Sequence, residues 1–318
     1  MTSNHSHNER FEEMSGLRGS SQPSPLVRAA EPARLARDSI GQPRGGREEK
    51  RSKSDYVTTL RTQSISQQLT DQDRLLLDVL HTVHLATGQQ LQRLIWGDGP
   101  SDARSARRQL RGLTDIRILA RLERRPLGVR GGSLGYVYAL DVVGQAITGV
   151  PRRRRRPRLP GMAFLDHAVA VTDCYLKLRQ LESTGRIELV HFQAEPRCWR
   201  SFVGPGGYQR LLKPDSHLIT GCGDYLDHWF LEIDRATESK ARLHTKIQAY
   251  TSFWQSGREQ ADTDVFPKVL WIVPDDKRLA QLAQVIQELP DDERRLHQIC
   301  TDDNFTTAIV LGPGSEEQ

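Results

Sequence analysis

The segment FLEIDRATES, residues 230–239, contains two carboxylates two positions apart within an apolar run. Such a run predicts a buried strand, and successive side chains of a strand point to opposite faces. Glu232 and Asp234 should therefore point to the same side as Phe230, while Leu231 and Ile233 point to the other. Two like charges on one strand face repel each other, so the pair requires either a metal ion or a basic partner.

A third carboxylate, Asp215, follows Lys213 and Pro214 at an expected break in the preceding strand. An aspartate at a strand bend and a glutamate on the neighbouring strand resemble the pattern of PD-(D/E)XK nucleases. In such nucleases the carboxylates hold magnesium, and a lysine orients or activates water. We therefore expect Asp215, Glu232 and Asp234 to be catalytic, with Asp215 and Glu232 as ligands of Mg²⁺ or Mn²⁺.

The position where this pattern has its lysine is occupied by Asp234. A carboxylate cannot stabilise a developing negative charge, although it could be a further metal ligand. The helix expected after the strand must pack on the sheet beside the site, and it carries Lys246. We take Lys246 as the candidate catalytic lysine, with Lys240 and Lys213 as alternatives. Tyr250, one helical turn after Lys246, could share its face.

An ordinary ion network is the alternative explanation for the acidic strand. In that case Glu232 and Asp234 would pair with nearby arginines, namely Arg210, Arg235 or Arg242. The sequence leaves both interpretations open.

The rest of the C-terminal half predicts a mixed α/β domain, because strand-like runs alternate with helical periodicity. Helices are expected at 162–182, 239–254 and 275–289. Strands are expected at 187–196, 208–220 (interrupted at Pro214), 228–234, 269–273 and 306–311.

The N-terminal half predicts three helices followed by a hairpin. The helices are expected within 69–87, 87–97 and 101–119, with Thr70 and Thr87 as caps of the first two. Two strand-like runs follow at 119–124 and 135–141, separated by a basic, glycine-rich segment. Three helices and a hairpin in this order are typical of a winged helix-turn-helix, whose third helix enters the major groove.

The third expected helix has two distinct faces. At about 100° per residue, Ala106, Leu110 and Leu113 fall on one side and predict the docking face. The opposite side carries the arginines Arg104, Arg108 and Arg111, with Arg107 flanking them. The hairpin adds Arg124, Arg125 and Arg130, and the linker PRRRRRPR adds Arg152, Arg153, Arg154, Arg155 and Arg156. Clustered arginines predict contacts with DNA phosphates, whereas a solvated face and a solvated hinge are the alternatives.

Composition limits the remaining classes. The 318 residues carry a net charge of +5 and have a mean hydropathy of −0.57. No apolar run approaches the roughly 18 residues of a membrane helix, and no signal peptide is evident, so we expect a cytoplasmic protein. The four cysteines show no metal-ligand spacing. No phosphate-binding loop, zinc-protease helix or nucleophile elbow occurs.

Five segments together resemble the replication-relaxation family: LTDQDRLLLDVL, LDHAVAVTD, LKPDSHL, FLEIDRATES and KIQAYTSFW. Proteins of this family occur on plasmids and integrated elements of actinobacteria and other Gram-positive bacteria. The resemblance implies an N-terminal winged helix, a nuclease-like core and a role in replication or mobilisation. It also implies functional roles for Asp215, Glu232, Asp234 and Lys246, and His167 stands where the family usually has a histidine.

We therefore expect a multidomain α/β protein with an N-terminal winged helix-turn-helix and a C-terminal PD-(D/E)XK nuclease-like domain. The expected segments are a disordered basic tail (1–66), the winged helix (67–150), an Arg-rich linker (151–160), the restriction-endonuclease-like domain (161–312) and a flexible tail (313–318). Its function would be replication, mobilisation or DNA relaxation of a mobile element, with Mg-dependent nicking. The alternative is a non-catalytic DNA-binding accessory factor or transcriptional regulator with a degenerate nuclease fold. Expected partners are double-stranded DNA and a separate relaxase or replication protein, because the histidine cluster of a relaxase is missing.

Overall fold

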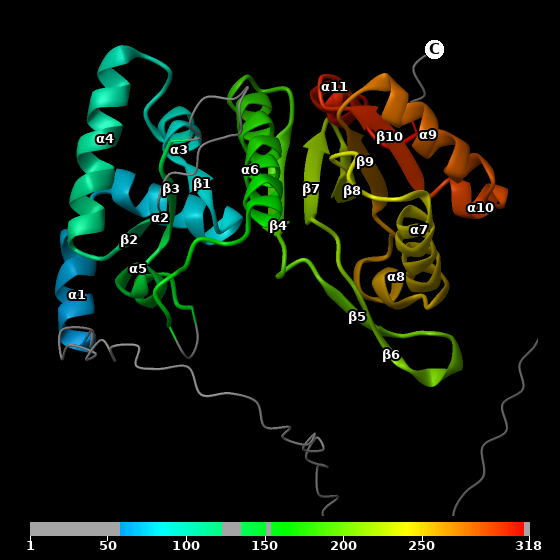
Figure 1. Ribbon diagram of the computed structural model, residues 1–318, viewed down its shortest axis with the longest axis horizontal. Coiled ribbons are helices and arrows are strands. Elements are labelled where there is room, and N and C mark those ends of the chain that lie inside the picture. The colour runs from blue at the N-terminus through cyan, green and yellow to red at the C-terminus, as the bar shows by residue number, and fades with distance from the viewer. Residues whose placement is uncertain (1–57, 123–134, 151–153, 315–318) are drawn as a thin grey trace, which may run out of the picture. The chain divides into compact units, whose positions relative to one another are not determined.

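The structure is a computed structural model that describes residues 58–122, 135–150 and 154–314. All of the described residues belong to one compact unit. Figure 1 labels the elements of the described chain. Five arginines that the sequence predicts to contact DNA lie outside the described residues, namely Arg124, Arg125, Arg130, Arg152 and Arg153.

The N-terminal part of this unit combines helices with a small antiparallel sheet. Its elements are α1 (Thr59–Gln68), α2 (Asp71–Val83), β1 (Ala86–Thr87), α3 (Gly88–Ile95), α4 (Pro100–Asp115), β2 (Leu119–Leu122), β3 (Val137–Leu140) and α5 (Val142–Ile147). The strands pair in the order β1-β3-β2, and both pairs are antiparallel. The helices enclose one apolar core, in which Leu76, Leu80, Leu91 and Leu110 are buried.

The sequence explains where two of these helices begin. The Thr70 hydroxyl oxygen accepts from the Asp73 N–H, and the Asp73 carboxylate accepts from the Thr70 N–H. Thr87 and Gln90 form the same reciprocal pair at the start of α3. Each capping box satisfies N–H groups that the first turn of a helix otherwise leaves without partners. Thr70 and Thr87 are the caps that the sequence predicts.

Two helix boundaries differ from the sequence-based expectation. Helix α1 begins at Thr59, within the segment that was expected to be a disordered tail, and its Ile65 packs on the core. Helix α4 ends at Asp115 and does not continue to Leu119. The reason is local backbone geometry, because Arg117 has a φ of +63° and Leu119 pairs with Leu140 in the sheet.

The C-terminal part contains a mixed sheet between two layers of helices. Its elements are α6 (Met162–Ser183), β4 (Glu188–Ala194), β5 (Arg200–Val203), a 3-10 turn (Pro205–Gly207), β6 (Gln209–Leu212), β7 (Ser216–Cys222), β8 (Tyr225–Ile233), α7 (Lys240–Gln255), α8 (Arg258–Thr263), β9 (Lys268–Val273), α9 (Asp276–Gln287), α10 (Asp291–Arg294), β10 (His297–Thr301) and α11 (Phe305–Leu311). The five-stranded sheet has the order β10-β9-β8-β7-β4. Strands β10, β9 and β8 are parallel, and β7 pairs antiparallel with both β8 and β4. The mixed α/β fold class predicted from the sequence is confirmed.

Side-chain alternation along β8 sorts its residues between the two helical layers. Phe230 joins the core formed with α7 and α9, whereas Trp229 and Leu231 join the core formed with α6 and α11. Glu232 therefore lies on the α7 side, two residues beyond Phe230. This is the face that the sequence assigned to it.

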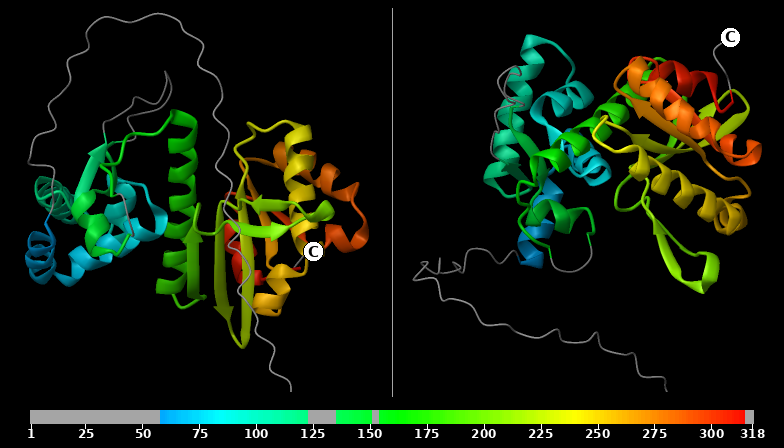
Figure 2. Two further views of the ribbon diagram at one scale, coloured as in Figure 1. Left: turned by 90° about the horizontal axis from the view of Figure 1, so that it is seen from below. Right: turned by 45° about the vertical axis from the view of Figure 1, so that its right-hand side comes forward.

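Two C-terminal predictions were wrong. Residues 306–311 form most of helix α11 and not a final strand, and β10 at 297–301 supplies that strand instead. Phe305, Ala308 and Ile309 are buried at helical spacing against the α6 side of the sheet. The run 208–220 is not one interrupted strand, because β6 pairs with β5 in a separate hairpin. This hairpin extends away from the five-stranded sheet in Figure 1 and in the right-hand view of Figure 2.

Candidate active site

The pairing of β7 with β8 brings Asp215 next to Glu232. Ser216 faces Leu231 in this register, so Asp215, just before β7, reaches the end of β8. The Asp215 N–H donates to the Leu231 carbonyl oxygen at 3.1 Å. The Asp215 Oδ2 in turn accepts from the Ile233 N–H at 2.7 Å. Two backbone contacts therefore hold this carboxylate at the end of the hairpin.

Helix α7 brings a lysine and a tyrosine to the second carboxylate. Glu232 is only 2% exposed. Its Oε2 lies 2.9 Å from the Lys246 Nζ, and its Oε1 accepts from the Tyr250 hydroxyl at 2.6 Å. Lys246 and Tyr250 are four residues apart, so they lie one above the other on the helix face. The side chain of Lys246 also lies 3.3 Å from Glu238.

The electrostatics of the cluster keep the lysine charged. Burial and the neighbouring Asp215 charge raise the pKa of Glu232, and Lys246 and Tyr250 only partly oppose this. Burial lowers the pKa of Lys246, but the charges of Glu232 and Asp215 outweigh burial, and the net shift is upward. Lys246 is therefore a fixed cation at neutral pH. Burial and Glu232 also raise the pKa of Tyr250, so its hydroxyl stays protonated.

Two further residues complete the cluster, and one of them was missed in the sequence. His167 on α6 places its Nε2 3.1 Å from Asp215 Oδ1 and 3.9 Å from Glu195 Oε1. Burial lowers the pKa of His167, but its hydrogen bond with Asp215 and the two carboxylate charges raise it overall. Glu195 follows β4, and its N–H donates to the Asp215 carbonyl oxygen. The pairing of Ala194 with Ser216 places Glu195 beside Asp215, and no local pattern in the sequence marks this contact.

Asp234 follows the same end of β8 but has a different partner. Its Oδ2 lies 2.6 Å from the Nε of Arg278 on α9, and its Oδ1 accepts from the Ala236 N–H at 2.8 Å. Both oxygens are therefore engaged, and a role as a metal ligand would require these contacts to be released. The structure thus joins Asp215, Glu232 and Lys246 in one cluster and ties Asp234 to α9.

The other basic residues considered from the sequence lie elsewhere. Arg235 pairs with Asp166 and Arg242 with Glu238, so neither forms the ion network suggested for Glu232 and Asp234. Lys240 pairs with Glu288 at 3.0 Å on the surface, and Lys213 lies over the Trp199 ring. Lys246 is the lysine that contacts Glu232.

Asp215 and Glu232 are the two side chains of the cluster that could hold a magnesium ion. Carboxylate oxygens are the ligands that Mg²⁺ prefers, and Mg²⁺ commonly uses one or two carboxylates together with water and substrate phosphate. Asp215 and Glu232 supply two such side chains. Within the described ranges, no group of three or more His, Cys, Asp or Glu side chains has the geometry of a metal site. Each oxygen of these two carboxylates already contacts a protein group, so a bound ion would have to displace some of these contacts, as it would at Asp234.

The basic face predicted for α4 is solvent-exposed. Ala106, Leu110 and Leu113 are buried against the core. The four arginines Arg104, Arg107, Arg108 and Arg111 are exposed on the remaining surface of the helix. Arg154, Arg155 and Arg156 of the linker are also exposed. These exposed arginine side chains are accessible to an anionic partner.

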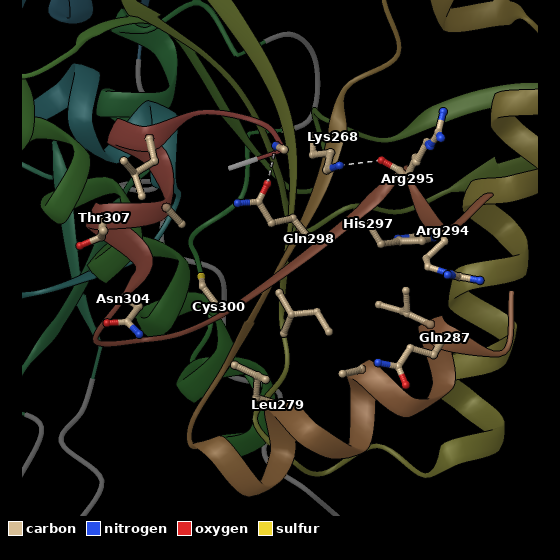
Figure 3. A pocket seen from close by; sticks show the side chains of 16 residues that line it. Lys268, Leu279, Gln287, Arg294, Arg295, His297, Gln298, Cys300, Asn304 and Thr307 are labelled. Carbon is tan, nitrogen blue, oxygen red and sulfur yellow. Dashed lines mark hydrogen bonds between the residues drawn. The ribbon is translucent and has the colours of Figure 1, made fainter. Parts of the chain in front are cut away.

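A cavity of about 540 Å³ lies at the β10 edge of the sheet. Figure 3 shows it between α9, β10 and α11, lined by polar groups such as His297 and Gln298 and by apolar groups such as Leu279. It contains none of the carboxylates or the lysine of the cluster. The cluster and this cavity are therefore separate features.

Comparison with known proteins identifies the family. A family model described as replication-relaxation matches residues 77–269, which is more than half of the chain and includes α4, Asp215, Glu232 and Lys246. No curated protein matches the sequence, and no solved structure matches it. Among the described residues, no helix is both long enough and apolar enough to cross a membrane. The chain belongs to the replication-relaxation family.

Proposed function

We propose that this protein binds double-stranded DNA of a plasmid or integrated mobile element and nicks it in a Mg²⁺- or Mn²⁺-dependent reaction during replication, mobilisation or relaxation. The observation that carries the proposal is the contact of Lys246 with Glu232 at 2.9 Å, beside Asp215. It supplies from a helix the lysine that the strand lacks. This contact supports a nuclease-like site in which the helix supplies the lysine.

The DNA-binding half of the proposal rests on α4. Helices α2, α3 and α4 are followed by the paired strands β2 and β3, the order of a winged helix-turn-helix. In such a domain the third helix enters the major groove, and α4 carries exposed arginines opposite its buried leucines. Arginines on this face would contact phosphates and guanine edges.

At the proposed catalytic site each side chain has a distinct role. Asp215 and Glu232 would hold the metal ion, which when bound polarises the attacked phosphate and lowers the pKa of a bound water. The Asp215 carboxylate is oriented by the Ile233 N–H and by His167, and Glu232 is oriented by Tyr250. Lys246 stays protonated and would stabilise the negative charge that develops on the phosphate.

A relaxase or replication protein is the proposed partner. The sequence has no relaxase histidine cluster, so strand transfer at a transfer origin would be carried out by another protein. The protein proposed here would bind and nick the duplex beside it.

A supercoiled plasmid assay tests the catalytic proposal. Purified protein would be incubated with plasmid and Mg²⁺ or Mn²⁺, alongside Asp215→Ala, Glu232→Gln and Lys246→Ala. Lys240→Ala is the matched control, because Lys240 lies on the same helix and pairs with a surface glutamate. We expect metal-dependent nicking by the wild type and the control, and none by the three cluster variants. Cleavage that persists in Lys246→Ala would refute the assignment of the lysine.

A second assay tests the DNA-binding half. Arg104→Gln and Arg108→Gln should lower the affinity for duplex DNA and reduce the salt slope of log K by about 0.9 per lost phosphate contact. Arg186→Gln is the control, because Arg186 is exposed on the loop between α6 and β4. Equal binding by all of these proteins would refute α4 as the DNA-contacting helix.

A non-catalytic accessory factor or regulator is the second candidate function. It is favoured by one observation: both oxygens of Glu232 already accept hydrogen bonds from protein groups. In that case Lys246 would take the place of a metal ion, and the cluster would be a structural remnant. Titration of the protein with Mn²⁺ separates the two candidates, because intact DNA binding without metal binding would favour the accessory factor.

A further inference from the structure

The β5–β6 hairpin begins and ends at the carboxylate cluster. Glu195 immediately precedes the hairpin segment, residues 196–214, and Asp215 immediately follows it. The Glu195 N–H donates to the Asp215 carbonyl oxygen at 3.0 Å, so the two ends of the segment are held together. The strands extend from this point away from the five-stranded sheet (Figure 1 and the right-hand view of Figure 2). Anything that the hairpin holds would therefore lie near Asp215.

One face of the hairpin packs on the protein from its base at Leu212 to Phe202, which lies next to the turn. Phe202 and Leu212 are buried in the core formed with α7 and α9. Arg200 contacts Glu259 on α8 at 3.0 Å, and its Nη1 donates to the Cys198 carbonyl oxygen. The hairpin therefore leaves the domain in a defined direction.

The tip is a defined turn that exposes an aromatic ring. Gly206 and Gly207 have φ values of +83° and +78°, which favour glycine over other residues. The Gly204 N–H donates to the Tyr208 carbonyl oxygen at 2.9 Å and closes the turn. Tyr208 is 76% exposed, and Val203 beside it is also exposed. A large ring held in solvent at a glycine-stabilised tip suggests a contact with another molecule.

The charge of the hairpin has one sign. Residues 196–214 contain no aspartate or glutamate and four basic residues. Arg197 contacts His81, and Arg200 is engaged by Glu259. Arg210 forms no ion pair within the described part of the chain and is exposed, and Lys213 is exposed beside Trp199. Arg210 and Lys213 therefore remain available to an anionic partner.

We propose that the β5–β6 hairpin is a DNA-contacting arm that lies in the major groove of the duplex and positions it over the Asp215–Glu232 cluster. Arg210 and Lys213 contact backbone phosphates, and Tyr208 contacts the groove. The inference rests on the proposed function and deepens it by naming how this site holds its substrate.

Size and charge both support a duplex as the occupant. The major groove, about 12 Å wide, admits a two-stranded ribbon. Four residues of β5 at about 3.4 Å each carry the tip roughly 14 Å from its base. A cationic arm without acidic residues complements phosphates better than it complements a typical protein surface.

Fluorescence anisotropy of the full-length protein with a labelled duplex, over a range of salt concentrations, tests the arm. The variants are Arg210→Gln and Tyr208→Ala, alone and combined. The matched control is the double variant Arg186→Gln/Tyr225→Ala, which removes an exposed arginine and an exposed tyrosine at the other end of the sheet. We expect Arg210→Gln to reduce the salt slope by about 0.9. Tyr208→Ala should also weaken binding, and the control should bind as the wild type does.

Each of the other outcomes refutes the proposal that the hairpin is a DNA-contacting arm. Arm variants that keep the affinity and salt slope of a DNA-binding wild type refute the arm alone and leave the proposed function standing. A wild type that does not bind duplex DNA refutes both. A control that loses as much affinity as the arm variants shows a general charge effect. Unchanged DNA binding with an altered sedimentation mass shows that the hairpin contacts protein instead.

Discussion

The ion pair between Asp234 and Arg278 gives the sharpest test of how the acidic strand works. The sequence places Asp234 among the catalytic carboxylates, whereas the structure pairs it with Arg278 at 2.6 Å. Arg278 also donates to the Glu238 carbonyl oxygen at 2.9 Å. It therefore fixes the loop that leads from β8 to α7, and hence the position of Lys246. We predict that Asp234 stabilises the fold and contributes little to metal binding.

The expected magnitude follows from burial. The side chains of Asp234 and Arg278 are only 2% and 10% exposed, so solvent screens the pair weakly. Opposite charges at about 4 Å with an effective dielectric constant of 20 attract by roughly 4 kcal/mol. Removing one partner leaves a buried charge without compensation, which typically costs about 3–5 kcal/mol. Arg278→Met should therefore lower the free energy of unfolding by about 3–5 kcal/mol, and Asp234→Asn by somewhat less.

Urea denaturation of the two single variants and of the double variant Asp234→Asn/Arg278→Met measures this coupling. The loss of stability in the double variant should be smaller than the sum of the two single losses by at least about 1 kcal/mol, because the double variant leaves no unpaired charge. Mn²⁺ affinity of folded Asp234→Asn should equal that of the wild type, and Lys240→Ala serves as the surface-pair control. An Asp234→Asn variant with unchanged stability and lost Mn²⁺ binding would refute the structural role and restore Asp234 as a ligand.

Three further predictions concern stability. Leu110→Ala should lower the free energy of unfolding by about 2–5 kcal/mol, because Leu110 lies on the buried face of α4. Arg107→Ala, on the exposed face of the same helix, should change it by less than about 0.5 kcal/mol. Similar effects of the two substitutions would contradict the assigned faces. Thr70→Ala removes the capping box of α2 and should cost about 1 kcal/mol in urea denaturation, so an unchanged midpoint would show that the cap is dispensable. Burial and the nearby Arg200 lower the pKa of His217 to about 3. Below pH 6.5 the unfolded state gains a proton that the folded state does not, so stability falls as pH decreases. His217→Phe should abolish about 1 kcal/mol of the loss between pH 7 and 5.5, and equal pH dependence in both proteins would contradict the buried neutral ring.

Periodicity and caps were readable from the sequence because they depend on neighbours within one helical turn. Thr70 and Thr87 cap their helices through residues three positions away. The spacing of Ala106, Leu110 and Leu113 likewise identified the buried face of α4. Local contacts of this kind need no knowledge of the rest of the fold.

Elements whose conformation depends on distant partners were not readable. The run 306–311 is rich in β-branched residues, and a short apolar run fits a strand or a buried helix equally well. Packing of Phe305 and Ile309 against α6 and the sheet selected the helix. Strand β10 has no strong apolar pattern, and its parallel pairing with β9 defines it. Only tertiary contacts could separate these alternatives.

The residues of the candidate site also divide into those that a local pattern indicated and those that only tertiary contacts revealed. The sequence by itself determined that Glu232 faces α7 with Phe230, since alternation along a strand is a property of the backbone. It also indicated Lys246 through its place on the following helix. Only the tertiary structure decided that His167 and Glu195 join Asp215 and that Asp234 pairs with Arg278. These contacts join residues far apart in the chain, and burial makes each unpaired charge costly, so packing of the sheet and helices settles which partner each carboxylate takes.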